Sequence, residues 1–206
     1  MLVALLGVLV AGGVAFGAMA FAGGSGGGLP WDKTASWDGK STLRCEVNGQ
    51  LTIENKIANV ATGPVISAGT NCRITVINST LSGQTGIDGG MNVTIEMRRS
   101  RIEATQRGVS CGVNCKVSMR EQSRISGKEH GVYGDANLKV EVRDSAVVSQ
   151  EVAIHGGPVT NVTGHGCDLQ GPTFAIQGGH ASKVDLVGCK VKGPKELLSG
   201  STISER

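Results

Sequence analysis

The chain has 206 residues, of which 39% are hydrophobic, so it can form one domain with a buried core and short flanking segments. Glycine contributes 32 residues whereas aromatic residues make up only 3%, a composition that favours many tight turns around a narrow aliphatic interior. The formal charge is only +3, because 20 basic residues are offset by 17 acidic ones. This weak field and the scarcity of aromatic stacking platforms exclude nucleic acid as an expected partner.

The first segment, residues 2–22, carries no charged or strongly polar side chain and is long enough to cross a bilayer. Two interpretations remain open. It is either a retained transmembrane anchor or a signal segment, because Ala18-Met19-Ala20 and Ala20-Phe21-Ala22 have the small-x-small pattern of a cleavage site. The anchor is slightly favoured, so we expect the membrane to be a partner through residues 2–22.

Two opposing signals bear on which side of the membrane the rest of the chain, residues 23–206, lies. Lys33, Lys40 and Arg44 follow the apolar run, which the positive-inside rule interprets as a C-terminal part inside the cell. However, these charges alternate with acidic residues, and six cysteines are typical of an oxidising compartment. We therefore expect the remainder to be extracytoplasmic, either periplasmic or at the cell surface, and secreted if the first segment is cleaved.

Residues 23–42 are predicted to form a glycine-rich linker and an N-terminal cap. Both tryptophans of the chain, Trp31 and Trp37, lie here. The open end of a repeat protein exposes core and unpaired strand edge, so we expect the tryptophans to help cover it, although a membrane-interface position is an alternative.

Residues 43–193 repeat with a period of roughly 22 residues, which predicts stacked units that share one core. Apolar residues alternate with polar ones in short segments separated by Gly, Asn or Ser, as β-strands require. Three apolar columns share this period: Ile53, Val76, Met97, Met119, Val142, Gly164 and Leu186; then Val65, Ile87, Val109, Val132, Ile154 and Ile176; then Val60, Leu81, Ile102, Ile125, Val147, Leu169 and Val191.

The fold expected from this pattern is all-β, a parallel β-helix of about seven rungs, where a rung is one complete coil of the chain. Residues 194–206 are expected to be a polar C-terminal tail. Two polar columns predict the corners of each rung, because Asn adopts left-handed turn conformations and stacked side chains can hydrogen-bond along the rod. They are Asn48, Asn71, Asn92, Asn114 and Asn137; then Ser79, Ser100, Ser123, Ser145, Cys167 and Cys189.

Within these repeats, Asn71-Cys72-Arg73-Ile74-Thr75-Val76 and Asn92-Val93-Thr94-Ile95 are each followed by a Ser turn and a Gly-Ile or Gly-Val step. They resemble the right-handed parallel β-helix repeats of the pectin-lyase-like superfamily over residues 45–193. The resemblance implies a right-handed coil, but the superfamily includes polysaccharide lyases, hydrolases, adhesins and binding or structural rods. Its enzymes have long loops that wall a groove, whereas the rungs here differ by about one residue, and no active-site residue can be carried over.

One cluster of outward positions is a candidate for catalysis. Glu129 and Glu151 share a column, and Tyr133 and His155 stand beside them in adjacent rungs. Stacked carboxylates can separate their pKa values for acid and base work, or hold a divalent cation with Asp135 nearby. The alternative is a set of solvated residues on a repetitive surface.

A second set of outward positions is a candidate for ligand binding. Arg98, Arg120 and Arg143 form one column, so they could hold an anionic polymer. Acidic residues in the adjacent column, among them Glu96 and Glu141, make mutual neutralisation the alternative.

The cysteines are expected to form disulfides, although the sequence alone leaves their connectivity open. Cys167 and Cys189 share a column in successive rungs and are therefore close enough to bond. Cys45 with Cys72 could tie the cap to the second rung, and Cys111 with Cys115 could clip one turn; buried free thiols are the alternative. The histidines lack zinc-ligand spacing, so no metal and no cofactor are expected.

The function expected from the sequence is a membrane-tethered cell-envelope β-helix, a non-enzymatic structural or ligand-binding module for an anionic polysaccharide or another envelope protein. One alternative is a small polysaccharide-active lyase or hydrolase that uses Glu129 and Glu151. Another is a self-assembling structural rod.

Overall fold

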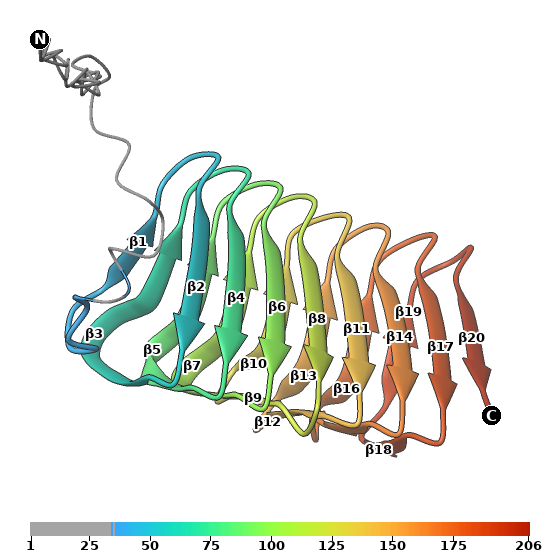
Figure 1. The fold of residues 1–206 in the computed structure, drawn as a ribbon. Coiled ribbons are helices and arrows are strands. Elements are labelled where there is room, and N and C mark those ends of the chain that lie inside the picture. The colour runs from blue at the N-terminus through green and yellow to red at the C-terminus, as the bar shows by residue number, and fades with distance from the viewer. Residues whose placement is uncertain (1–33, 35) are drawn as a thin grey trace, which may run out of the picture.

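The computed structural model describes residue 34 and residues 36–206. The chain coils into a rod of successive rungs, each made of three faces (Figure 1). All neighbouring strands are parallel. The predicted all-β parallel solenoid of about seven coils is therefore confirmed.

Face 1 is an eight-stranded sheet. Its strands, in spatial order, are β2 (Gln50–Glu54), β4 (Arg73–Ile77), β6 (Thr94–Arg98), β8 (Lys116–Arg120), β11 (Lys139–Arg143), β14 (Asn161–His165), β17 (Lys183–Val187) and β20 (Thr202–Glu205).

Faces 2 and 3 are the two halves of one bent sheet of 12 strands. The long strands β3 (Ile57–Ala68), β5 (Thr80–Gly89) and β7 (Arg101–Cys111) run through the bend and belong to both faces. Face 2 continues with β9 (Arg124–Gly127), β12 (Ala146–Ser149), β15 (Asp168–Gln170) and β18 (Lys190–Lys192). Face 3 contains β1 (Leu43–Cys45), β10 (His130–Gly134), β13 (Val152–Gly156), β16 (Phe174–Gly178) and β19 (Lys195–Leu197).

The core lies inside the coil and is aliphatic, as the apolar columns predict. On face 1 the first column is confirmed residue by residue, because Ile53 pairs with Val76 and the register continues without a shift to Leu186. The other two columns are wrong only in the first rung. There Leu81 lies opposite Ala58 rather than Val60, and Ile87 lies opposite Ile66 rather than Val65. The cause is an irregularity in β3 that shifts the register between Val60 and Pro64.

The asparagine column forms a ladder along the corner between faces 3 and 1. Each side-chain amide donates to the side-chain oxygen of the asparagine one rung before it, over 2.8 to 2.9 Å. All five asparagines have φ between 52° and 59°, the left-handed conformation that Asn tolerates. In the next two rungs Val159 and Ala181 occupy the corner, with φ of 61° and 54°.

Replacing Val159 by Asn is expected to stabilise the protein. A β-branched residue is strained at this φ, and an amide at position 159 could donate to Asn137 and lengthen the ladder. Because Val159 is 39% exposed, little apolar burial is lost. We expect a gain of about 1 kcal/mol, or roughly 2–4 °C in Tm, measured by thermal denaturation. Val159→Ala, which removes the branch without adding an amide, should give a smaller gain; equal melting of all three proteins would contradict the prediction.

The serine column forms the corner between faces 1 and 2. Ser100 is fully buried, and its hydroxyl accepts from the backbone N–H of Ser79 over 3.2 Å while it donates to the carbonyl of Arg98. Cys167 and Cys189 continue the column, with the Cys167 N–H directed at Cys189 Sγ. These bonds satisfy buried backbone groups where the chain turns.

Three disulfides link the six cysteines in the pairs suggested by the repeat. They join Cys45 to Cys72, Cys111 to Cys115, and Cys167 to Cys189, with Cα–Cα distances of 6.3, 6.0 and 4.4 Å. Disulfides persist in oxidising compartments, so they indicate an extracytoplasmic environment.

The N-terminal end of the rod is covered by residues 36–42. Trp37 is buried in the core cluster, and its indole N–H donates to the carbonyl of Ser41 over 2.7 Å. The carbonyl of Gly39 accepts from the backbone N–H of Asn59, on the part of β3 that β1 does not pair with. Residues 2–22 and Trp31 lie outside the described residues. In the part of the chain that is described, no helix is both long and apolar enough to span a membrane.

The solenoid extends beyond residue 193. β19 pairs with β16 and β20 pairs with β17, so much of the segment expected to be a polar tail forms a further rung.

Candidate functional site

The predicted arginine column lies at the end of the face 1 strands, in rungs that stack without a register shift. Arg98 pairs with Arg120, and Arg143 follows Val142, which pairs with Met119. All three side chains are exposed. Neighbouring rungs are about 4.8 Å apart, so the three guanidinium groups form a row parallel to the rod axis.

Glu141, one of the acidic residues beside this row, is engaged by lysines instead. Glu141 lies 2.9 Å from Lys139 and 3.5 Å from Lys116, and its pKa is lowered, chiefly by the hydrogen bond from Lys139. In the described part of the chain, Arg98, Arg120 and Arg143 take part in none of the ion pairs. Glu141 is therefore neutralised by lysines, whereas Glu96 lines a small hollow together with Arg98 and Arg120.

Two more arginines stand just around the corner on face 2. Arg101 of β7 pairs with Arg124 of β9, so like charges again lie directly opposite each other. They line a hollow of about 330 Å³ whose lining also includes Asp144 and Asp168. Sequence reasoning missed this pair, although each precedes an inward isoleucine of the third column and must point outward. We call Arg98, Arg101, Arg120, Arg124 and Arg143 the arginine surface.

Like charges on adjacent strands destabilise a sheet. The arginine surface places three arginines in one column and two in another, and none of them takes part in a described ion pair, although Asp144 and Asp168 line the same hollow as Arg101 and Arg124. This arrangement of like charges does not stabilise the fold. An anion bound beside these side chains would lower that electrostatic cost.

The candidate catalytic residues occupy a different place, on face 3 and at the bend before it. Tyr133 and His155 stack with ring centroids 5.1 Å apart and an interplanar angle of 2°. The Arg107 guanidinium lies over the Tyr133 ring, 4.7 Å from its centroid, and pairs with Glu129 over 3.2 Å. The carboxylate of Glu129 is thus held by an arginine, whereas Glu151 is exposed.

His130 joins this stack, which sequence reasoning did not foresee. Its ring lies 5.2 Å from both Tyr133 and His155 in edge-on contact. Burial, helped by the neighbouring charge of His155, lowers the pKa of His130 to about 4, so this imidazole is neutral at neutral pH. A hydrogen bond with Asp135 raises the pKa of Tyr133.

Hydrogen bonds extend the stack along the rod. The Nδ1 atom of His155 lies 2.7 Å from Gln177 Oε1, and the Gln177 amide donates to Glu196 over 2.8 Å. The faces of the Tyr133 ring are taken by Arg107 and His155, so they are not free to stack on a sugar. Among the described residues, no group of three or more His, Cys, Asp or Glu is placed to hold a metal ion.

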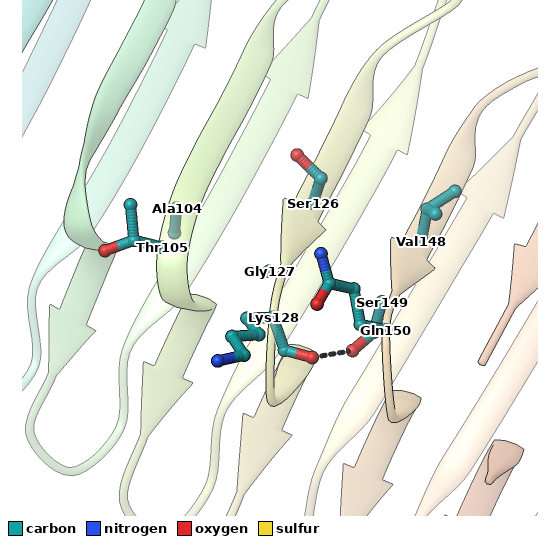
Figure 2. Close-up of a pocket in the computed structure, with 8 residues that line it drawn as sticks. All are labelled: Ala104, Thr105, Ser126, Gly127, Lys128, Val148, Ser149 and Gln150. Carbon is teal, nitrogen blue, oxygen red and sulfur yellow. Dashed lines mark hydrogen bonds between the residues drawn. The ribbon is translucent and has the colours of Figure 1, made fainter. Parts of the chain in front are cut away.

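A larger hollow, of about 480 Å³, lies at the bend between faces 2 and 3 (Figure 2). The Ser149 hydroxyl lies 2.9 Å from the carbonyl oxygens of both Lys128 and Glu129, which fixes the chain at this bend. The lining includes the residues just before Glu129 and Glu151 but neither acid. It consists of Ala104, Thr105, Ser126, Gly127, Lys128, Val148, Ser149 and Gln150.

The fold and its bonds define an all-β, disulfide-linked parallel β-solenoid with an unpaired arginine surface. Comparisons with protein-family models, curated proteins and solved structures found no match to this chain.

Proposed function

We propose that the protein is a non-enzymatic binding module of the cell envelope that holds an anionic polymer, such as an acidic polysaccharide, along the arginine surface. The observation that carries this proposal is the column of Arg98, Arg120 and Arg143, which is exposed and without described ion pairs, beside Glu141, which lysines already neutralise. A row of cations parallel to the rod axis suits an extended chain with repeated negative charges better than a single small anion.

The location belongs to the same proposal. Three disulfides support an oxidising compartment, and residues 2–22 have the length and apolarity of a membrane anchor. The linker would then present the rod at a distance from the bilayer. A right-handed coil, and kinship with pectin-lyase-like repeats, are also proposed; parallel strand crossovers are right-handed in nearly all proteins.

Catalysis on a polysaccharide is less well supported than binding. Glu129 is engaged by Arg107, and neither Glu129 nor Glu151 lines the hollow beside them. The pair also lacks a described cleft that would exclude water from a reaction.

The triple variant Arg98→Gln, Arg120→Gln, Arg143→Gln is expected to bind an anionic polymer roughly tenfold more weakly, because each exposed charge pair contributes about 0.5 kcal/mol. Binding of the full chain in mild detergent to immobilised dextran sulfate can be measured at several salt concentrations, with neutral dextran as the blank. The variant should also show a weaker dependence on salt.

The matched control removes three positive charges elsewhere, through Arg44→Gln, Lys190→Gln and Lys192→Gln. These side chains are exposed on faces 3 and 2 and take part in none of the described ion pairs. The control should retain most of the binding. Equal losses in both triple variants would mean that net charge alone attracts the polymer, and undiminished binding by the arginine variant would refute the proposed site.

A further inference from the structure

The last described rung differs from all the others in the residues at its inward positions. Lys195 pairs with Ile176 and therefore continues a column of buried residues that includes Ile154 and Val132. Glu205 pairs with Leu186 and continues the first apolar column in the same way. Two charged residues thus occupy positions that are apolar in nearly all preceding rungs.

These two residues bond to each other. The Lys195 ammonium lies 2.9 Å from the Glu205 carboxylate, and their side chains are 22% and 49% exposed. Because one strand belongs to face 3 and the other to face 1, the ion pair reaches across the end of the core. It borders a hollow of about 440 Å³ that Leu186 and Val191 also line.

The surrounding edge carries further features that discourage strand pairing. β18 and β19 have three residues each and β20 has four. Lys190 and Lys192 project from β18, and Pro194, which has no N–H to donate, precedes β19. Short edge strands, lysines, proline and inward-pointing charges are the means by which natural sheets avoid edge-to-edge association.

We propose that the Lys195–Glu205 ion pair prevents the C-terminal end of the solenoid from stacking on a second copy of the chain. Stacking would add strands to β18, β19 and β20 and would force both charges out of water. Desolvating an ion pair costs more than its Coulomb attraction returns unless further polar partners are supplied, and the aliphatic core of another rung supplies none. At the opposite end, Trp37 packs against the core and the carbonyl of Gly39 bonds to β3.

This inference separates two of the functions considered for the rod. A structural filament built by end-to-end stacking requires two apolar ends with free strand edges. The charged rung opposes that assembly and favours a solenoid that acts as a discrete module. The inward charges themselves, rather than the position of the last residue, distinguish this rung.

The test replaces both charges by the residues of the preceding rung, as Lys195→Ile with Glu205→Leu. Sedimentation velocity of the full chain in mild detergent, over a hundredfold range of concentration, should show larger species that increase with concentration and are absent from wild type. The control Lys183→Ile with Glu196→Leu makes the same change of composition at exposed outward positions of the last two rungs and should sediment as wild type.

A charge swap, Lys195→Glu with Glu205→Lys, keeps an ion pair at these positions, so this variant should sediment as wild type. Circular dichroism of each variant checks that the β-sheet is retained. The proposal is overturned if the Ile/Leu variant sediments like wild type, or if the outward control assembles to the same extent.

Discussion

Replacing Gly108 by Ala should lower the free energy of unfolding by about 3 kcal/mol, because the added methyl group has no room between two rungs. A Cβ atom on Gly108 would lie against Cγ2 of Ile125 and 2.5 Å from the carbonyl oxygen of Gly131. The carbonyl belongs to the next rung, so the added group cannot be accommodated by a rotamer change. The rungs would have to separate, which breaks the hydrogen bonds between β7 and β10.

Urea denaturation followed by circular dichroism, with the disulfides intact, measures this loss. Gly112→Ala is the matched control, because a Cβ there would meet its nearest atom, the carbonyl oxygen of Gly90, at 3.3 Å. We expect that variant to stay within about 0.5 kcal/mol of wild type. If Gly108→Ala were as stable as the control, the rungs would have to be less tightly spaced at this corner than the structure shows.

Gly108 also marks how far the sequence could predict the fold. Its column is restricted to small residues from the second rung onward, yet glycine is so common in this chain that the restriction does not stand out. The column reads Gly86, Gly108, Gly131, Ala153 and Ala175. The period of the larger apolar residues was enough to predict parallel stacking, because a one-residue slip would expose a whole column.

Local departures from the period were not predictable in the same way. The irregularity between Val60 and Pro64 shifts two columns in the first rung, and a second register shift follows between Gly83 and Thr85 in the next rung. The last rung was missed because Lys195 and Glu205 break the apolar pattern at the two positions by which a rung is recognised.

The candidate sites, too, could be predicted only in part from the sequence. Positions along a column follow from the period, so the row of Arg98, Arg120 and Arg143 was predictable. Which charges pair with each other depends on side-chain reach across columns, and there the sequence was less informative. Glu129 bonds to Arg107 one rung earlier rather than acting with Glu151, and His130 enters the aromatic stack from a diagonal position.

The asparagine ladder supports a second prediction of large effect, in which Asn92→Val lowers the free energy of unfolding by about 2–3 kcal/mol. Asn92 donates to Asn71 over 2.9 Å and accepts from Asn114 over 2.8 Å, and the variant loses both bonds. It also places a β-branched residue at φ 56°, which costs about 1–2 kcal/mol. Chemical denaturation of both proteins measures the sum.

Asn92→Gly separates the two causes, because glycine accepts the left-handed conformation but has no amide. Its loss should be about 1 kcal/mol, the share due to the ladder bonds. Equal losses in the Gly and Val variants would assign the whole effect to the amides, in which case Val159 would not be strained and Val159→Ala should gain nothing. A loss confined to the Val variant would mean that backbone conformation alone selects asparagine at these corners, with the visible ladder as its consequence.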